Sequence, residues 1–477
     1  MLTTRGSKLG LILAIALLAS ACAPGGAVTS VPPIATPGGA ATPSASPGAS
    51  APASAPASAV ASPGASASVP AASAQAVTLE WFSALNENEP YVAAYKQIIS
   101  NFEASHPGIT IHVTWMGRQL STKIRPLLQS GTKPDIVEDD LQIMYAGLQK
   151  DGLVADLTPY LGQKDASGSS TWKDDWSAGS LELLSKPGEL DTLPFWVNAT
   201  QVFYDQRTFD KNGFTAPATW DALMAMCATL KTASLPCFGE EGGFADYNMF
   251  WMSELTDRLM GPDALLTAAT DKTGQTWLQP DYLAAAQKEA SLKSNGYLPK
   301  GFEGSQYPAA QIGWVNGKSA FYLLSDWLPS ELVDKTPPGF VFRSFPFPTV
   351  DGKGSTTDIE LFQWGFSLFK DAPHAEQAVE FLKYFTSPDN FKPLQTDYAF
   401  VSPLKTPYTP KDNADSQENI RAGTAVHGYI GGLVAKAPDY LQSVLEPLND
   451  KLIFGQITAD QFIQQISAAS ATYWKNH

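Results

Sequence analysis

An abrupt change in composition near residue 77 limits what this chain can fold into. No charged residue occurs between Lys8 and Glu80, and no aromatic residue occurs before Trp81. Residues 23–76 consist almost entirely of Ala, Ser, Pro, Gly, Thr and Val. Such a segment buries too little apolar surface to offset the entropy lost on ordering, so we predict a disordered tether. An O-glycosylated stalk is a compatible alternative.

Residues 1–22 have the pattern of an export signal. Arg5 and Lys8 flank the start of an apolar stretch, residues 9–18, that is too short to span a bilayer as a stable helix. The sequence Leu-Ala-Ser-Ala-Cys ends at Cys22 and resembles the bacterial lipobox. The resemblance implies cleavage before Cys22 and lipidation of its thiol, which would anchor the chain to a membrane. An ordinary cleaved signal with an incidental Cys is the alternative.

Composition excludes several classes of function. A chain of 477 residues is too long for one ordinary domain, so we expect at least two lobes. Asp and Glu number 47 against 32 Lys and Arg, and this acidic balance argues against a nucleic-acid partner. The five His are scattered, and phosphate-loop, nucleophile-elbow and zinc-protease motifs are absent from the sequence. We therefore predict no catalytic residues, no cofactor and no metal site.

Two cysteines remain once Cys22 is assigned to the lipid. Cys227 and Cys237 form an even pair in a chain that carries an export signal. We predict a disulfide between them, with two buried thiols as the alternative.

After residue 77 the apolar pattern alternates between strand and helix. The predicted order begins with a strand at 78–82, a helix capped by Asn88 and ended by His106, a strand at 109–115, a helix at 119–130 and a strand at 134–137. This order predicts parallel neighbours in an α/β sheet. Later we predict strands at 193–204 and 320–324, and helices that begin after Thr219, at Pro373 and after Thr458.

Several sequence blocks in this part of the chain carry a family resemblance. They lie at 81–83, 131–137, 151–157, 193–196, 203–205, 217–221, 316–321, 326–327 and 455–458, and include Gly-Thr-Lys-Pro-Asp-Ile-Val and Pro-Ala-Thr-Trp-Asp. Each block is weak by itself. In this order they resemble family 1 of the extracellular solute-binding proteins of ABC importers, the maltose-binding-like family.

The resemblance implies a two-lobed α/β fold of the periplasmic-binding-protein type II class, with discontinuous lobes joined by hinge crossovers. It places the N-lobe at 77–195 plus 362–400 and the C-lobe at 200–360 plus 403–477. A monomer that binds its ligand in the interlobe cleft is expected.

A cleft for a polar solute needs aromatic faces for stacking and polar groups for specificity. From the resemblance and from positions after predicted strands, the candidate ligand contacts are Asn86, Glu87, Asp139, Asp140, Trp196, Asn198, Tyr247, Trp251, Trp327 and Trp364. The alternatives are helix capping at 86–88, a solvated acidic turn at 138–140, and helix core for Tyr247 and Trp251.

We therefore expect a lipid-anchored, extracytoplasmic receptor, on the cell surface or in the periplasm. It would bind a sugar or oligosaccharide and deliver it to an ABC permease. A polyamine or other cationic solute is the first alternative, because acidic groups and aromatic rings both attract cations. An anchored glycoside-processing enzyme and an adhesin or sensor subunit are the others, although no paired-acid motif supports an enzyme.

Overall fold

The folded part of the chain begins at the composition boundary. The computed structural model describes residues 76–117, 120–177, 180–181, 189–332, 334–351, 358–422 and 425–477. The predicted signal, the tether and the lipidation site Cys22 lie outside these residues and stay predictions.

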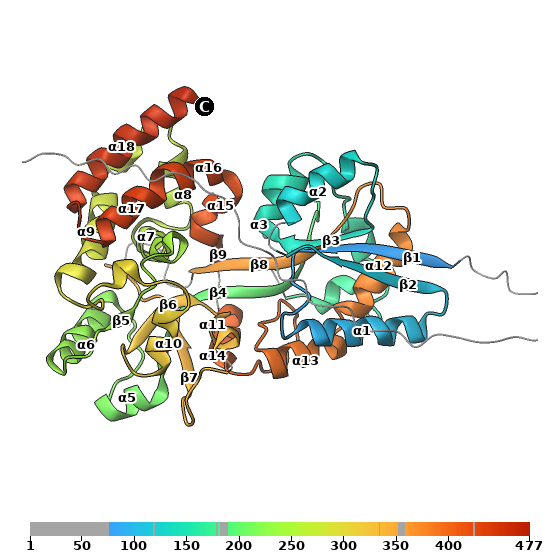
Figure 1. The fold of residues 1–477 in the computed structure, drawn as a ribbon, viewed down its shortest axis with the longest axis horizontal. Helices are drawn as coiled ribbons and strands as arrows, with labels where there is room; N and C mark the ends of the chain where they lie inside the picture. Colours follow the sequence, from blue (N-terminus) through green and yellow to red (C-terminus); the bar gives the residue numbers. More distant parts are fainter. Residues whose placement is uncertain are drawn as a thin grey trace, which may run out of the picture. The chain divides into compact units, whose positions relative to one another are not determined.

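Two long antiparallel strands, β4 (Leu193–Asp205) and β8 (Asp358–Leu368), lie in the middle of the sheet (Figure 1). Within the described residues, nine strands pair in the order β2-β1-β3-β8-β4-β6-β5, with β7 beside β4 and β9 beside β8. The other strands are β1 (Val77–Ser83), β2 (Ile109–Trp115), β3 (Ile136–Asp140), β5 (Phe238–Gly239), β6 (Phe321–Ser325), β7 (Phe342–Phe345) and β9 (Ala425–Gly428). Because β1 pairs in parallel with both β2 and β3, the predicted β-α-β-α-β order is confirmed.

Helices connect these strands and cover the sheet. They are α1 (Val92–Ser105), α2 (Leu120–Gln129), α3 (Leu141–Met144), α4 (Thr158–Leu161), α5 (Gln206–Asn212), α6 (Trp220–Thr232), α7 (Ala245–Met260), α8 (Ala264–Thr270), α9 (Pro280–Ser294), α10 (Ala309–Val315), α11 (Leu328–Glu331), α12 (Ala375–Phe385), α13 (Pro388–Tyr398), α14 (Ala414–Ala422), α15 (Leu433–Lys436), α16 (Pro438–Tyr440), α17 (Glu446–Ile453) and α18 (Ala459–Asn476). Shorter helical turns include η2 (Tyr145–Gln149) and η6 (Tyr429–Gly432). In the part of the chain that the structure describes, no helix has the length and apolar character needed to cross a membrane.

Two helix starts follow the local sequence signals. The Thr219 hydroxyl oxygen accepts the backbone N–H of Ala222 at the start of α6. Thr458 and Gln461 form a reciprocal capping box at the start of α18. Each pattern satisfies N–H groups that the helix itself cannot pair, so both starts agree with the prediction.

The first helix starts later than predicted. Helix α1 begins at Val92, and Asn88 is an exposed loop residue rather than its cap. The reason is a competing hydrogen bond network, because the Glu89 carboxylate accepts both the backbone N–H and the side-chain amide of Asn86 at 2.7 and 2.9 Å. This network holds the residues before the helix in a turn.

The buried side chains form two large cores. The first core draws on residues 79–195 and 364–404, and the second on 202–350 and 429–466. Strand β4 contributes to both, with Phe195 in the first and Val202 in the second, and a small cluster around Ala199 lies between them along the strand. Phe362 of β8 packs against both cores. The two long strands therefore link the cores.

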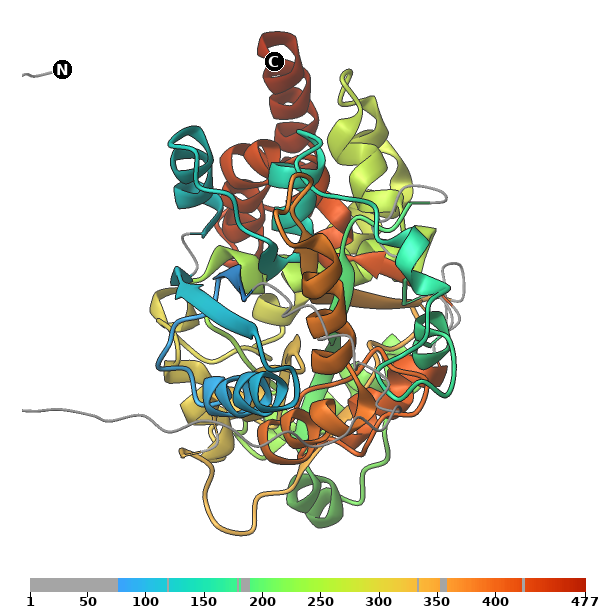
Figure 2. The ribbon, with the colours of Figure 1, turned by 90° about the vertical axis from the view of Figure 1, so that its right-hand side faces the viewer.

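The first core is built around Trp81 of β1. Its ring lies 5.6 Å from the ring of Phe366 in β8 and 5.5 Å from that of Phe385 in α12. Helices α1 and α12 lie side by side (Figures 1 and 2), and Phe102 and Phe381 pack between them at 5.0 Å. Fully buried rings of this size contribute several kcal/mol each to folding.

The pairing of β8 with β4 requires a glycine at position 365. A Cβ atom there would lie 2.4 Å from the carbonyl oxygen of Leu193 and 2.6 Å from the Leu141 side chain. Gly365 therefore permits the close approach of the two strands beside the core.

A disulfide joins Cys227 in α6 to Cys237 just before β5, with 5.0 Å between the Cα atoms. Both residues are buried in the second core. The bond fastens the helix to the edge of the sheet, closing a short loop.

Glu240 supplies a test of buried charge in the second core. Its carboxylate is 2% exposed and accepts the indole N–H of Trp251 at 2.8 Å, and burial raises its pKa to about 8. The folded chain therefore keeps a proton on Glu240 that the unfolded chain releases above about pH 4.3. Stability falls as pH rises through this window, by at most about 1.4 kcal/mol per pH unit for one proton. We predict that Glu240→Gln, which lacks this titration, gains stability relative to wild type from pH 5 to pH 8.

Chemical denaturation of both proteins at each pH measures this gap. The exposed Glu418→Gln, which removes one surface carboxylate, serves as the control for the loss of charge itself. A constant gap for Glu240→Gln would contradict the prediction.

Candidate ligand-binding site

The pairing of β4 with β8 places four side chains on one face of the sheet. Trp196 lies opposite Trp364, and Asn198 lies opposite Phe362. Because directly opposed residues of an antiparallel pair point to the same side, and every second residue does so too, these four share a face. The Trp196 and Trp364 rings are 5.7 Å apart in an edge-to-face arrangement.

A local irregularity in β4 sets the orientation of Trp196. The register shifts between Pro194 and Trp196, as is common where proline interrupts a strand. Phe195 enters the first core, whereas Trp196 is partly exposed and packs against Phe400 at 3.8 Å and Tyr91 at 5.4 Å.

Two rings from the second core extend this surface. Trp327, directly before α11, lies 5.5 Å from Phe362, and Tyr429 of η6 lies 5.3 Å from the same ring. Phe250 of α7 supports Tyr429 at 5.5 Å. We call Trp196, Phe362, Trp364, Trp327 and Tyr429 the aromatic face. Trp196, Phe362 and Trp327 are partly exposed, so ring surface is available at both ends of the face.

Asn198 adds an amide to the aromatic face. Its side chain is buried, and its Nδ2 donors have no hydrogen bond partner among the described residues. The indole N–H of Trp196 is also buried without a partner there. An unpaired buried donor costs about 1–3 kcal/mol, so both groups would gain from an oxygen atom supplied by a ligand.

Acidic side chains approach the face near Tyr429. Burial raises the pKa of the Tyr429 hydroxyl well above its ordinary value, and the negative charges of Asp246, Glu360 and Asp140 raise it further. Asp140 ends β3, and Asp246 is in the first turn of α7.

The neighbouring Asp139 points elsewhere. It lines a small cavity with Leu120 and Ile124 of α2 and with Met144 and Leu148. Its Oδ1 accepts the backbone N–H of Asp140 at 2.8 Å. The structure therefore separates the two aspartates.

Tyr247 of α7 lies behind Phe250, whose ring is 6.1 Å from that of Tyr247 and 6.4 Å from that of Trp327. Burial raises the pKa of the Tyr247 hydroxyl above its ordinary value. Tyr247 is 7% exposed, so it backs the aromatic face rather than forming its surface.

Trp364 is held by a buried carboxylate that the sequence analysis missed. Its indole N–H donates to Glu138 Oε1 at 2.9 Å, and the Tyr95 hydroxyl donates to the same oxygen at 3.0 Å. Ser83 donates to the other oxygen of Glu138. Glu138 thus fixes Trp364, whose ring is 3% exposed, in one orientation.

Three further predicted contacts, besides Asp139, lie apart from the aromatic face. Asn86 and Glu87 are exposed, and their bonds stay local, because Asn86 binds Glu89 and Glu87 pairs with Lys96 at 2.7 Å. Ligand contact by these two residues stays a prediction.

Trp251 is a core residue, so its predicted ligand contact is wrong for this conformation. It is fully buried and packs edge-on against Phe238 and Phe347 at 4.7 and 6.1 Å. Helix α7 is buried on all sides between Tyr247 and Leu259, and a helix of this kind has no outer face to offer a ligand.

Phe362 and Tyr429 complete the face but were not among the predicted residues. Phe362 precedes Trp364 by two positions in the same strand, so strand alternation could have identified it. Tyr429 follows a short strand late in the chain, and no local pattern indicates its position beside Phe362.

The chain is similar to known solute-binding proteins in sequence and in fold. Residues 86–390 match the family described as bacterial extracellular solute-binding protein. The chain is 23% identical over 324 residues to the multiple sugar-binding protein of Streptococcus mutans, covering 65% of this chain and 71% of that protein. It is 23% identical over 253 residues to the diacetylchitobiose binding protein NgcE of Streptomyces coelicolor, covering 49% of this chain and 50% of that protein. A solved chitin oligosaccharide binding protein shares the fold with a TM-score of 0.67 and 22% identity, over 84% of this chain and 99% of that one.

The fold is therefore the mixed α/β fold of periplasmic binding proteins, as predicted. The chain belongs to the bacterial extracellular solute-binding protein family, which confirms the resemblance found in the sequence. The family consists of receptors rather than enzymes, in agreement with the prediction for this chain.

Glu138 provides a test of how the site is held. Replacing Glu138 with Ala leaves the Trp364, Tyr95 and Ser83 donors without their acceptor. Since an unpaired buried donor costs about 1–3 kcal/mol, we predict that Glu138→Ala lowers the free energy of unfolding by roughly 3 kcal/mol or more. Urea denaturation followed by tryptophan fluorescence measures this loss. The exposed Glu87→Ala should change stability by less than about 0.5 kcal/mol, and equal effects of the two substitutions would contradict the assignment.

Proposed function

We propose that the chain is a lipid-anchored receptor that binds a sugar or oligosaccharide outside the cytoplasm and delivers it to an ABC permease. The observation that carries the proposal is the aromatic face itself, which combines partly exposed rings with the unpartnered buried amide of Asn198. Stacking on sugar C–H faces and hydrogen bonding to hydroxyls require these two kinds of group.

The relatives support a sugar ligand. One is named for multiple sugars, a second for diacetylchitobiose and a third for chitin oligosaccharides. A site with several partly exposed aromatic rings matches an extended ligand better than a single small ion, because such rings can stack on different sugar units.

The aromatic face lies where two lobes would close on a ligand. We infer an N-lobe at 77–195 plus 362–400 and a C-lobe at 200–360 plus 403–477. The residue ranges of the two hydrophobic cores support this division. Trp364 belongs to the first core and Trp196 packs against it, whereas Tyr429 belongs to the second core and Trp327 packs against it. Hinge motion at β4 and β8 would then open and close the site.

A cationic solute such as a polyamine is the second candidate. The carboxylates of Asp140 and Asp246, whose charge acts on the Tyr429 hydroxyl, favour it, because carboxylates and aromatic faces both attract ammonium groups.

Permease delivery and membrane attachment through Cys22 belong to the proposed receptor function. The lipobox supports the anchor, and the family match supports a location outside the cytoplasm.

Trp327 tests the sugar proposal. Its ring is partly exposed and belongs to the aromatic face, so Trp327→Ala should weaken oligosaccharide binding at least about tenfold. Isothermal titration of the unlipidated chain with chitooligosaccharides, raffinose and spermidine measures affinity and ligand class together. Trp474→Ala is the control, since this partly exposed indole donates to Ala269 far from the face. Binding of spermidine but of no sugar would overturn the sugar class, and release of sugar products with time would overturn the receptor.

Replacing Asn198 tests whether its unpaired amide contributes to binding while lowering stability. Asn198→Leu removes an unpaired buried amide, so the ligand-free variant should be as stable as wild type or up to about 2 kcal/mol more stable. The same change should weaken sugar binding at least about tenfold because the amide donor is lost. Thermal melts without and with ligand measure both effects. Unaltered affinity would remove Asn198 from the site.

A further inference from the structure

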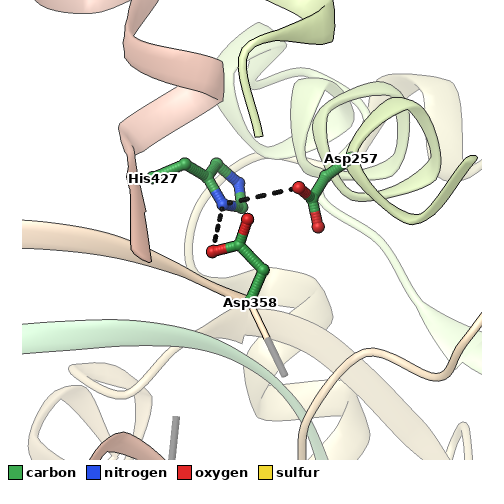
Figure 3. Close-up of side chains that lie close together, drawn as sticks. All are labelled: Asp257, Asp358 and His427. Carbon is green, nitrogen blue, oxygen red and sulfur yellow. Dashed lines mark ion pairs between the residues drawn. The ribbon is translucent and has the colours of Figure 1, made fainter. Parts of the chain in front are cut away.

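A polar cluster lies in the interior around His427 of β9, two residues before Tyr429. Strands β8 and β9 are parallel, with Asp358 opposite Ala425 and Glu360 opposite His427. This register brings His427 beside the alternate residues Asp358 and Glu360 of β8. Helix α7 packs against them and supplies Asp257. Figure 3 shows the imidazole of His427 and the carboxylates of Asp257 and Asp358 pointing toward one another.

The three side chains offer ligand atoms at metal-binding separations. His427 Nδ1 lies 3.3 Å from Asp358 Oδ1 and 3.9 Å from Asp257 Oδ1, and one ligand atom of each residue lies within 4.8 Å of the others. Two ligands of a tetrahedral ion with bonds of about 2.1 Å are about 3.4 Å apart. The distances therefore approach those of a site around one ion.

The ligand atoms are buried and poorly paired. All three side chains are at most 4% exposed. His427 Nδ1, Asp257 Oδ1 and Asp358 Oδ2 have no partner of hydrogen-bonding geometry among the described residues. Buried polar atoms are almost always paired, so an ion bound by all three residues would account for these exceptions.

Glu360 is placed to orient the imidazole. Its Oε2 lies 3.5 Å from His427 Nε2, which has no hydrogen bond to a described residue, and its carboxylate also accepts the hydroxyls of Thr200, at 3.0 Å, and Ser253. A carboxylate on one ring nitrogen fixes the proton there and leaves the lone pair of the other nitrogen for a metal. Nδ1, which faces the two aspartates, is that other nitrogen.

The balance of charge also favours a bound cation. Four carboxylates meet in the cluster, from Glu254, Asp257, Asp358 and Glu360, all buried. Arg258 pairs with two of these carboxylates, with Glu254 at 3.2 Å and with Asp257 at 2.6 Å. Burying four carboxyl groups beside one guanidinium is costly unless protons or cations neutralise their charge, and a divalent ion at the three ligand atoms would do so.

We propose that Asp257, Asp358 and His427 bind a structural divalent transition metal ion, of the Zn²⁺ or Mn²⁺ type. One imidazole with two carboxylates suits these ions, whereas Ca²⁺ takes six to eight oxygen ligands. The ion connects α7 to the β8–β9 pair and holds the chain two residues before Tyr429. The proposal replaces the sequence-based expectation of no metal site, which rested on the scattered positions of the His residues. It does not depend on the identity of the solute.

Metal content and stability test the site. The full unlipidated chain, purified from medium containing both metals, should carry about one equivalent of metal by mass spectrometry. Chelation should lower the melting temperature, and ZnCl₂ or MnCl₂ should restore it. Asp358→Asn and His427→Gln should abolish the metal equivalent, and Glu360→Gln should weaken metal affinity about 10–100-fold.

His374→Gln is the matched control. This residue also sits 3.3 Å from a buried aspartate, Asp135, but outside the proposed site, so it should keep the full metal equivalent. A wild-type chain that binds neither ion and melts identically with and without chelator would overturn the proposal, even where a variant fails to fold. So would nitrogen-15 spectra showing His427 protonated at both ring nitrogens in the presence of metal, because the imidazolium would then bridge the carboxylates instead.

Discussion

The antiparallel pairing of β4 with β8 is the constraint on which the rest of the structure depends. It links the two hydrophobic cores, and it sets which side chains face the aromatic surface. The pairing has little tolerance, because Gly365 leaves no room for a side chain against the backbone of Leu193. A slip of one residue would turn Trp196 and Asn198 to the opposite face and take apart the candidate site.

The cores and the site have opposite demands on polarity. In the first core, Glu138 satisfies three donors and holds Trp364 still. On the aromatic face, Asn198 and the Trp196 indole are left without partners among the described residues. Binding proteins need this contrast, because a group already paired within the protein has nothing to gain from a ligand. Glu138, which positions Trp364, is therefore satisfied, whereas Asn198 and the Trp196 indole are not.

Much of the fold could be predicted because local sequence patterns indicate its strands and helix starts. Strand alternation located β1, β2 and β4, and capping residues located the starts of α6 and α18. Trp196, Asn198 and Trp364 were predicted as candidates from the family resemblance, and they lie together on the paired strands β4 and β8. Trp251 was misassigned because a helix buried on every side has the same local pattern as one with an outer face.

Long-range relations could not be predicted in this way. The approach of Tyr429 to Phe362, and of His427 to Asp257 and Asp358, depends on how β9 adds to the sheet. The residues that meet there are separated by up to 170 positions, and no spacing motif connects them. The start of α1 was predicted too early for a different reason, since the carboxylate of Glu89 binds the backbone and side chain of Asn86 and holds the residues before the helix in a turn.

Each core combines segments that are distant in the sequence, and this affects when the chain can fold. The first core includes Phe400 and Leu404, so it stays incomplete until that part of the chain is available, and the second core needs residues as late as Ile466. Neither half can close around its own apolar residues early in synthesis, and contacts of such long sequence separation form slowly. A chain that delays its own collapse remains extended for longer. That delay would suit export under the signal predicted at residues 1–22, because unfolded chains can be threaded through a narrow channel.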